Sequence, residues 1–223
     1  MFFPIGDVNL TKGHKPFLTY LIIALNVAIF VWQFTMPERE QYQFVYTYGT
    51  IPIEIIHFQD WFTLLTNIFL HGGWFHLLGN MLFLWVFADN IEATLGYGKF
   101  ILFYLAGGIL ASLTHIVLNP MSEIPCVGAS GAIAACLGAY LVMFPSSKIK
   151  VLFIFILTSF RVPAIFFLGF WIIQQFTAGI GAIQASTAQT DGVAYWAHIG
   201  GFVFGVVVGL MYRSKAKELV ATA

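Results

Sequence analysis

Three short polar stretches, each at the start of an apolar segment, hold the residues of this chain that could do chemistry. They read His71-Gly-Gly-Trp-Phe-His76-Leu-Leu-Gly-Asn80, Gly128-Ala-Ser130-Gly131 and Ala197-His198-Ile-Gly-Gly201. A serine hydroxyl is a weak nucleophile until a neighbouring base takes its proton, and a histidine can be that base. Ser130 and His198 are therefore candidates for the nucleophile and the general base of a hydrolytic site.

The first polar stretch offers a second kind of chemistry. His76 and Asn80 are four residues apart, so on a helix they share one face. Imidazole and amide groups can both donate hydrogen bonds to one anion, as an oxyanion hole requires. Ser130, expected in the first turn of a helix, adds unpaired backbone N–H groups that help to stabilise an oxyanion. Gly128 and Gly131 would let the backbone turn tightly and let a substrate chain approach.

The elements that must position these residues are apolar helices. A spanning helix needs about 20 mostly apolar residues. Six segments reach or approach that length, namely residues 16–34, 74–95, 99–118, 128–144, about 162–178 and about 193–212. Residues 36–70 are too polar to span cleanly and suit a long interfacial loop with short amphipathic helices. Residues 148–160 are apolar and β-branched, and they are either a partly buried connector or the start of a longer, kinked fifth helix.

Composition places the chain in a membrane. Hydrophobic residues make up 59% of it and charged residues only 9%, against roughly a quarter charged in an ordinary soluble domain. The formal net charge is zero, so no basic field indicates nucleic acid as a partner. We predict an all-α polytopic membrane protein in which residues 1–223 form a single domain. It has six transmembrane helices and short cytoplasmic tails at 1–15 and 213–223.

The basic residues predict the orientation of the helices. Lys and Arg concentrate in the cytoplasmic loops of membrane proteins. With six spans and both termini inside, nine of the 10 Lys and Arg residues fall on the inner side and only Arg39 falls outside. The opposite orientation would reverse this bias. We therefore expect helices two, four and six to run from the outer side to the inner side.

This topology brings the three polar stretches to one depth, because each lies near the outer end of its helix. At 1.5 Å per residue, His198 sits roughly 8 Å below that end. Ser130, His76 and Asn80 are expected in the same layer. A Ser–His dyad is chemically sufficient, and no outer carboxylate must complete a triad, although Asp191 is close enough to His198 in sequence to be checked.

Each polar residue also has a purely structural interpretation. A Gly-x-Ser-Gly stretch in a membrane helix is more often packing than catalysis, and Asn80 alone could hold helices together. Gly201, Gly205 and Gly209 recur every four residues, a spacing that lets helix backbones come close. Such close packing would bring the helix of His198 to the helix of Ser130.

The histidines do not predict a metal site. The spacing of His71, His76 and Asn80 does not match the zinc-binding pattern HExxH, and no carboxylate lies between them. His115, near the outer end of the third helix, has no evident partner and is interpreted as structural or interfacial. We expect no metal ion at this site.

In combination, the motifs resemble the rhomboid family of intramembrane serine proteases in its bacterial, six-helix form. The resemblance covers about residues 16–212. It rests on His71, His76 and Asn80 in the first stretch, Glu92-Ala-Thr-Leu-Gly96, Gly128-Ala-Ser130-Gly131 and Ala197-His198-Ile-Gly-Gly201-x-x-x-Gly205, in the order of the family.

The resemblance implies a serine endopeptidase without a cofactor. Ser130 would be the nucleophile and His198 the general base, and His76, Asn80 and the backbone N–H of Ser130 would form the oxyanion hole. His71, with Gly128 and Gly131, would line the cavity. The usual substrates of such proteases are single-span membrane proteins, cut in the bilayer near a small residue where the helix unwinds easily.

The resemblance also assigns the connecting segments. Residues 36–70 would be the family's large first loop, and helix five with residues 179–192 would form a movable gate and cap. One departure is that many relatives carry Trp-Arg in the first loop where this chain has Trp61-Phe62. That change puts in doubt a salt bridge that would anchor the loop, but it does not affect the dyad.

Two other function classes are compatible with a helical membrane protein. A catalytically silent relative that binds or escorts membrane proteins would usually lack the serine or the histidine, and both are present here. A transporter that relays protons through histidines would more often show inverted repeats and broken helices around a midplane site. Here no repeat is evident, and the polar layer is off-centre. We see no cleavable signal or transit peptide, so we expect a retained first span and a prokaryotic plasma membrane. The sequence predicts neither the oligomeric state nor the physiological substrate.

Overall fold

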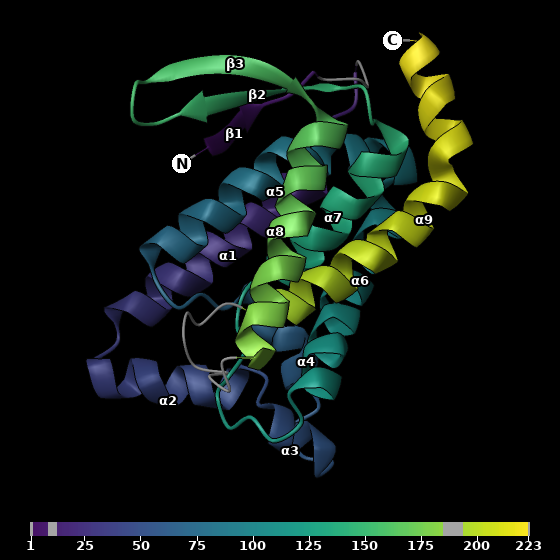
Figure 1. The fold of residues 1–223 in the computed structure, drawn as a ribbon. Helices are drawn as coiled ribbons and strands as arrows, with labels where there is room; N and C mark the ends of the chain where they lie inside the picture. Colours follow the sequence, from purple (N-terminus) through teal and green to yellow (C-terminus); the bar gives the residue numbers. More distant parts are fainter. Residues whose placement is uncertain (1, 9–12, 185–193, 223) are drawn as a thin grey trace.

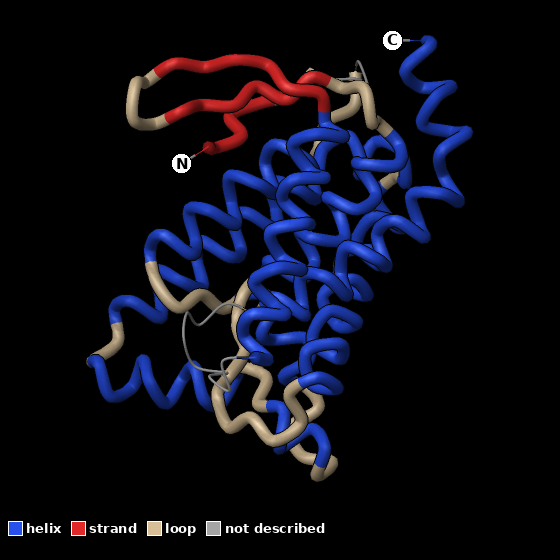
Figure 2. Tube along the Cα trace, in the orientation of Figure 1, coloured by secondary structure: helices blue, strands red, loops and turns tan. Residues whose placement is uncertain are grey.

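Long helices form most of the molecule. The computed structural model describes residues 2–8, 13–184 and 194–222. In this part of the chain the longest helices are α1 (Phe17–Thr35), α5 (Trp74–Leu95), α6 (Tyr97–Leu118), α7 (Ser130–Met143), α8 (Ala164–Gln184) and α9 (Tyr195–Thr222). They pack as one bundle (Figures 1 and 2). The six predicted helices are therefore all present, and the predicted helical membrane bundle is confirmed.

The helix ends differ from the prediction at the C-terminal side of the chain. Helix α9 continues to Thr222, so the predicted solvated tail at 213–223 is helical over its described residues, and most of its side chains are exposed. Helix α8 also runs beyond the predicted end at 178. The extension of α9 follows from the good helix formers Ala, Lys, Glu and Leu in residues 213–222.

Among the described residues, four helices are long and apolar enough by themselves to cross a bilayer, namely α1, α6, α8 and α9. Helix α7 is apolar but only 14 residues long. Helix α5 has 22 residues, and its last two turns carry Asp89, Asn90 and Glu92. Asn90 and Glu92 are fully buried, so protein rather than lipid surrounds these polar side chains.

Short helices make up the long first loop, as predicted. They are α2 (Glu38–Tyr48), α3 (Pro52–Ile56), α4 (Thr63–Thr66) and the 3-10 turn η1 (Asn67–Phe69). Figure 1 shows them at the end of the bundle away from both chain termini. The two termini lie at the same end, as an even number of crossings requires.

A small antiparallel sheet covers the end of the bundle near the termini. Its strands, in the order β1-β2-β3, are β1 (Phe2–Gly6), β2 (Lys148–Phe153) and β3 (Thr158–Pro163). The segment 148–160 is thus a partly buried connector that leads into α8, as one of the two predicted alternatives had it, and not the start of a longer fifth helix. That it forms a β-hairpin was not predicted. Lys148 and Lys150 are exposed while Ile149 and Val151 are buried, which is the two-residue period of a strand.

Helix α7 is the centre of the bundle, and glycines let α9 lie against its backbone. A Cβ placed on Gly201, Gly205 or Gly138 would overlap the backbone of the facing helix, at Gly131, Ala135 and Phe202 respectively. Side chains on these glycines would push the two helices apart. The predicted close contact between the helices of Ser130 and His198 is confirmed.

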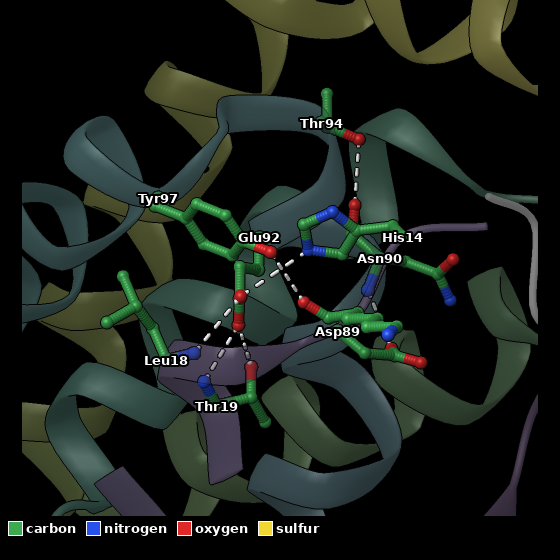
Figure 3. Close-up of polar contacts among 9 residues, drawn as sticks. His14, Leu18, Thr19, Asp89, Asn90, Glu92, Thr94 and Tyr97 are labelled. Carbon is green, nitrogen blue, oxygen red and sulfur yellow. Dashed lines mark hydrogen bonds and ion pairs between the residues drawn. The ribbon is translucent and has the colours of Figure 1, made fainter. Parts of the chain in front are cut away.

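Glu92, part of the Glu92-to-Gly96 motif, fastens α1 to α5 near the chain termini. Its buried carboxylate accepts hydrogen bonds from the backbone N–H groups of Leu18 and Thr19 and from the Thr19 hydroxyl, at 2.6–3.1 Å (Figure 3). His14 Nε2 lies 3.4 Å from the same carboxylate. Glu92 therefore satisfies backbone donors at the start of α1, which no side chain of α1 caps.

Candidate active site

Ser130 and His198 are in direct contact. Ser130 is the first residue of α7, and His198 lies in the first turn of α9. The Ser130 Oγ atom is 2.8 Å from His198 Nε2, within hydrogen-bonding distance. The glycine-mediated packing of α7 against α9 holds these two residues, 68 positions apart in sequence, together.

The other ring nitrogen of His198 has a partner on α8, which sequence reasoning missed. Gln175 Oε1 lies 2.7 Å from His198 Nδ1. The amide nitrogen of Gln175 donates to the carbonyl oxygen of Trp171, one turn earlier, at 3.5 Å. This bond leaves Oε1 as the atom that faces the imidazole. The signal was available, since Gln175 is a polar residue in an apolar helix and such residues face other helices or water.

Trp171 on α8 packs against the face of His198. The ring centroids are 5.8 Å apart, and the indole also contacts Phe202 of α9 at 6.1 Å. Trp171 and Gln175 are one helical turn apart, so they lie on the same face of α8. One face of α8 therefore contacts both the ring plane and the Nδ1 atom of the imidazole.

His76 is oriented so that one nitrogen is available as a donor. Its Nδ1 accepts a hydrogen bond from the Gly72 N–H at 3.4 Å, so the neutral ring carries its proton on Nε2. A Cβ placed on Gly128 would lie 2.8 Å from that Nε2 atom and 3.6 Å from Asn80 Nδ2. Both donors thus lie over the backbone that leads into Ser130.

Gly128 has two reasons to be glycine. Its φ angle is +131°, a conformation that side chains strongly disfavour. The space where its Cβ would lie is taken by the His76 ring. Its N–H donates to the carbonyl oxygen of Asn67 at 2.9 Å, so the first loop holds the residues just before Ser130.

The first loop fastens this backbone at a second point. Thr50 and Cys126 exchange two backbone hydrogen bonds at 2.8 and 3.0 Å. The Asn67 amide donates to Thr50 Oγ1 and to the Thr63 carbonyl oxygen, and it lies 3.3 Å from Ser112 Oγ on α6. A buried polar network therefore joins the first loop, α6 and the approach to Ser130.

A cavity of about 710 Å³ opens at the helix starts of α5, α7 and α9. Ser130, His198, His76 and Asn80 all line it, so the predicted meeting of three distant polar stretches is confirmed. His115 also lines it and lies 3.4 Å from the Asn119 amide. Asn119 was not expected as the partner of His115 because it lies just beyond the end of α6.

Three residues expected to line the cavity lie behind its wall instead. His71 is fully buried, and Gly131 packs against Ala111 of α6. Gly128 is covered by the His76 ring. His71 is held out of the cavity by its hydrogen bond, at 2.9 Å, with the amide nitrogen of Asn80.

His71 acts on the site through Asn80. Burial lowers the pKa of His71 to about 3, so the imidazole is neutral near pH 7 and its Nε2 can accept from Asn80. The Asn80 amide has a second N–H that this bond does not use. His71 therefore orients an amide that borders the cavity.

The described residues that line the cavity include no Asp, Glu, Lys or Arg. Asp191 and much of the segment expected to form the cap lie outside the described residues. Within the described part of the chain, no group of three His, Cys, Asp or Glu side chains could hold a metal ion. Among the described residues, the polar groups that line this site are hydroxyls, imidazoles, amides and the Cys126 thiol.

The chain matches known proteins over most of its length. The model of the rhomboid domain matches residues 59–215. Rhomboid protein 1, mitochondrial, of Saccharomyces cerevisiae is 31% identical over 213 residues, which cover 93% of this chain and 56% of that protein. Rhomboid protease GluP of Bacillus subtilis is 38% identical over 137 residues, which cover 61% of this chain and 26% of that protein.

A third relative is the human presenilin-associated rhomboid-like protein, mitochondrial, which is 28% identical over 95% of this chain and 51% of its own length. This chain thus spans between about a quarter and just over half of the length of these relatives. Because they come from a bacterium and from mitochondria, the bacterial form stays a prediction. The domain match covers well over half of the chain, and its apolar helices are long enough to cross a bilayer. The chain is an integral membrane protein and belongs to the rhomboid family.

Proposed function

We propose that this chain is a serine endopeptidase that cleaves other membrane proteins in or near their transmembrane segments. The observation that carries the proposal is the 2.8 Å contact between Ser130 Oγ and His198 Nε2 at the wall of a cavity. Relatives named as rhomboid proteases support the same reaction class. Both members of the dyad are present, which disfavours a catalytically silent binder or escort.

The proposed reaction begins at Ser130. His198 Nε2 takes the hydroxyl proton while Oγ attacks the carbonyl carbon of the scissile peptide bond. The carbonyl oxygen becomes an oxyanion, and the Nε2–H of His76, an amide N–H of Asn80 and the backbone N–H of Ser130 donate hydrogen bonds to it. His198 then gives its proton to the leaving amine as the C–N bond breaks.

Water completes the reaction. It loses a proton to His198 Nε2 as its oxygen attacks the acyl carbon. The bond between that carbon and Ser130 Oγ then breaks, His198 returns the proton to Oγ, and the carboxylic acid product leaves. The site must therefore admit water at membrane depth. The cavity bordered by Ser130, His76 and His198 provides that space.

Gln175 would act in this scheme as a positioning residue. His198 must present an unprotonated Nε2 to Ser130, so its proton must be on Nδ1. The Gln175 oxygen accepts a hydrogen bond from the Nδ1–H group of His198, which favours the required tautomer and ring orientation. The site is then a Ser–His pair with a neutral third member supplied by α8.

The proposed substrates are single-span membrane proteins. Backbone inside lipid keeps its helical hydrogen bonds, so a protease must expose an extended segment before it can attack. Helix-breaking residues near the cut lower that cost. Helix α8, with the segment 179–192 that is described only to residue 184, would be the gate and cap through which a substrate enters.

We also propose the orientation and location. The distribution of basic residues supports cytoplasmic termini and a Ser130 cavity towards the outer side. The membrane would be a prokaryotic plasma membrane. The sheet and both chain ends lie together, at the end of the bundle away from α2 and α3 (Figure 1), whereas residues at the starts of α5, α7 and α9 line the cavity. Residues 1–223 would be one membrane domain whose first loop, 36–70, rests in the interface.

The decisive experiment compares the wild-type chain with Ser130→Ala in detergent. Cleavage of a generic transmembrane substrate and labelling by a fluorophosphonate are measured together, and thermal unfolding checks the fold. Loss of both signals in a folded Ser130→Ala protein is the expected result. Cleavage that survives the substitution would rule out Ser130 as the nucleophile, and a wild-type chain that neither cleaves nor labels would favour a silent binder.

A further inference from the structure

The β2–β3 hairpin exposes a run of large apolar side chains. Its turn is Ile154-Phe155-Ile156-Leu157, and these side chains are 45%, 76%, 67% and 79% exposed. Exposed apolar residues on the long helices are explained by lipid around the bundle. The hairpin is not a spanning element, because its strands have six residues each. It therefore needs its own explanation, since a contiguous exposed apolar patch marks an interaction surface.

The residues of this turn are not the types found in turns that face water. Turns that face solvent favour Gly, Asn, Asp, Pro and Ser, and this one contains none of them. Leu157 even adopts a left-handed conformation, with φ of 47°, which costs a non-glycine residue energy. Four consecutive large apolar residues at that position favour a turn that is surrounded by apolar material.

The two faces of the sheet differ in what they contact. On one face, Ile149 and Val151 of β2 are buried against the bundle. Strand alternation puts Phe153 on the same face, further towards the turn. Phe2 stacks on Phe153, with centroids 4.8 Å apart, and meets Phe160 edge-on at 6.1 Å. This aromatic trio is only partly covered, and Phe2 and Phe160 are 52% and 44% exposed.

The aromatic trio is less buried than Ile149 and Val151 because the sheet passes the edge of the bundle there. Figures 1 and 2 show the hairpin extending sideways beyond the helix ends that it covers. The face that packs on helices near Ile149 therefore continues, at the aromatic trio, over the space beside the bundle. For a membrane protein that space is occupied by lipid.

The opposite face of the sheet is basic. Lys150 and Arg161 are cross-strand partners, and Lys148 lies two residues before Lys150 on the same face. All three are exposed, and the chain has no Asp or Glu between residues 124 and 190. Basic side chains beside an apolar face match the anionic headgroups that lie above an acyl layer.

We propose that the β2–β3 hairpin, with Phe2 of β1, lies in the membrane interface at the end of the bundle away from Ser130. The aromatic trio and the turn 154–157 insert into the acyl layer of that leaflet, and Lys148, Lys150 and Arg161 remain among anionic headgroups. The partner is phospholipid. The sheet thus anchors the start of α8, which follows β3 directly.

The test places an environment-sensitive fluorophore on single cysteines in the full chain. Phe155→Cys reports the turn, and Ser159→Cys, an exposed β3 position paired with Leu152 on the basic face, is the matched control. The unsubstituted chain keeps Cys126 and buried Cys136 and gives the background labelling. The proteins are reconstituted in nanodiscs of phosphatidylethanolamine and phosphatidylglycerol, after a check that each unfolds at the temperature of the parent.

Two quenchers then distinguish the environments. Lipids with a nitroxide near the top of the acyl chain are expected to quench the label at 155 several-fold more than the label at 159, and water-borne acrylamide is expected to show the reverse. Equal acrylamide quenching at both sites would overturn the proposal, because the turn would be in water. Protection of position 155 from both quenchers would also overturn it, because another protein or a second copy would cover the hairpin. The test does not depend on catalysis, so it stands apart from the proposed protease function.

Discussion

Each ring nitrogen of His198 has its own partner, and the two partners come from different helices. Ser130 Oγ on α7 contacts Nε2 and Gln175 Oε1 on α8 contacts Nδ1. If the base must be in one tautomer, removing the Nδ1 acceptor lowers the population that can take the serine proton. The consequence is a loss of rate rather than of substrate binding.

We expect Gln175→Met, which keeps the volume and removes the acceptor, to lower kcat by about 10- to 100-fold while KM changes little. Gln175→Glu keeps an acceptor oxygen and is expected to retain much more activity. Steady-state cleavage of a transmembrane substrate measures both constants. Gln174→Met, at the exposed neighbouring position, is the control and should be near wild type. Equal activity of Gln175→Met and the wild type, in a chain that Ser130→Ala inactivates, would remove Gln175 from the mechanism and leave the dyad intact.

The proposed oxyanion hole makes a prediction for His76. His76→Ala removes one donor to the oxyanion, so kcat should fall by about 10²- to 10³-fold with a smaller change in KM. His115→Ala is the matched control, because His115 lines the same cavity and lies beside the Asn119 amide rather than near Gly128. Steady-state measurement of kcat and KM for both variants tests this prediction. If His115→Ala loses as much kcat as His76→Ala, the cavity rather than one specific donor is what matters.

At the scale of elements, the contact of α7 with α9 determines the distance between the dyad residues. Gly205 faces the carbonyl of Ala135 so closely that a methyl group cannot fit. We expect Gly205→Ala to cost about 1–3 kcal/mol of stability through overpacking and to lower cleavage as the helices separate. Thermal unfolding in detergent and the cleavage rate report the two effects.

Gly169 on α8 is the control for that experiment. A Cβ on Gly169 would meet no atom within 4 Å, so Gly169→Ala should unfold at or above the wild-type temperature. If Gly205→Ala also behaves like the wild type, the close approach of α7 and α9 is not what positions His198.

Particular elements explain what the sequence could and could not predict. Long apolar runs predicted the helices, and the positions of Ser130, His76 and His198 near helix starts predicted that they meet. The hairpin was missed because its apolar turn lacks the Gly or Asn that usually indicates a turn between two strands. Gln175 was missed because its function depends on the rotation of α8 against α9, which periodicity does not determine. His71 was misplaced because sequence spacing does not show which side of Asn80 faces the cavity.

At the scale of the whole molecule, the N-terminal strand is fastened to the bundle by a buried acid. Tyr140 OH and Asn90 Nδ2 donate hydrogen bonds to Asp7 Oδ2, and Asp89 is a further acid nearby. Burial raises the pKa of Asp7 from 3.8 to about 6, and these hydrogen bonds only partly oppose the shift. Between about pH 4 and pH 6 the docked strand therefore keeps a proton on Asp7 that the free strand has released.

The higher pKa of Asp7 in the docked strand determines how the docking of β1 depends on pH. Docking of β1 is favoured at acidic pH and weakens as the pH rises from about 4 through about 6, because the docked state binds more protons in that range. Hydrogen exchange of the β1 amides, corrected for intrinsic rates, should show greater protection at about pH 5 than at about pH 7.5. Asp7→Asn cannot ionise and should remove most of this difference. Equal pH dependence in both proteins would assign the effect to Asp89 or another group.

The shortness of α7 has a consequence for where a substrate would be cut. Its 14 residues measure about 21 Å along the axis, against a hydrocarbon layer of about 30 Å. Because α7 ends where the chain turns into the sheet, the helix would, in the proposed orientation, be a spacer between the inner interface and Ser130. Thicker bilayers would therefore leave the nucleophile further from the outer surface, and the same substrate would be cut at a bond nearer to the middle of its helix. Membrane thickness, and not only the amino acids around the scissile bond, would select the cleavage position.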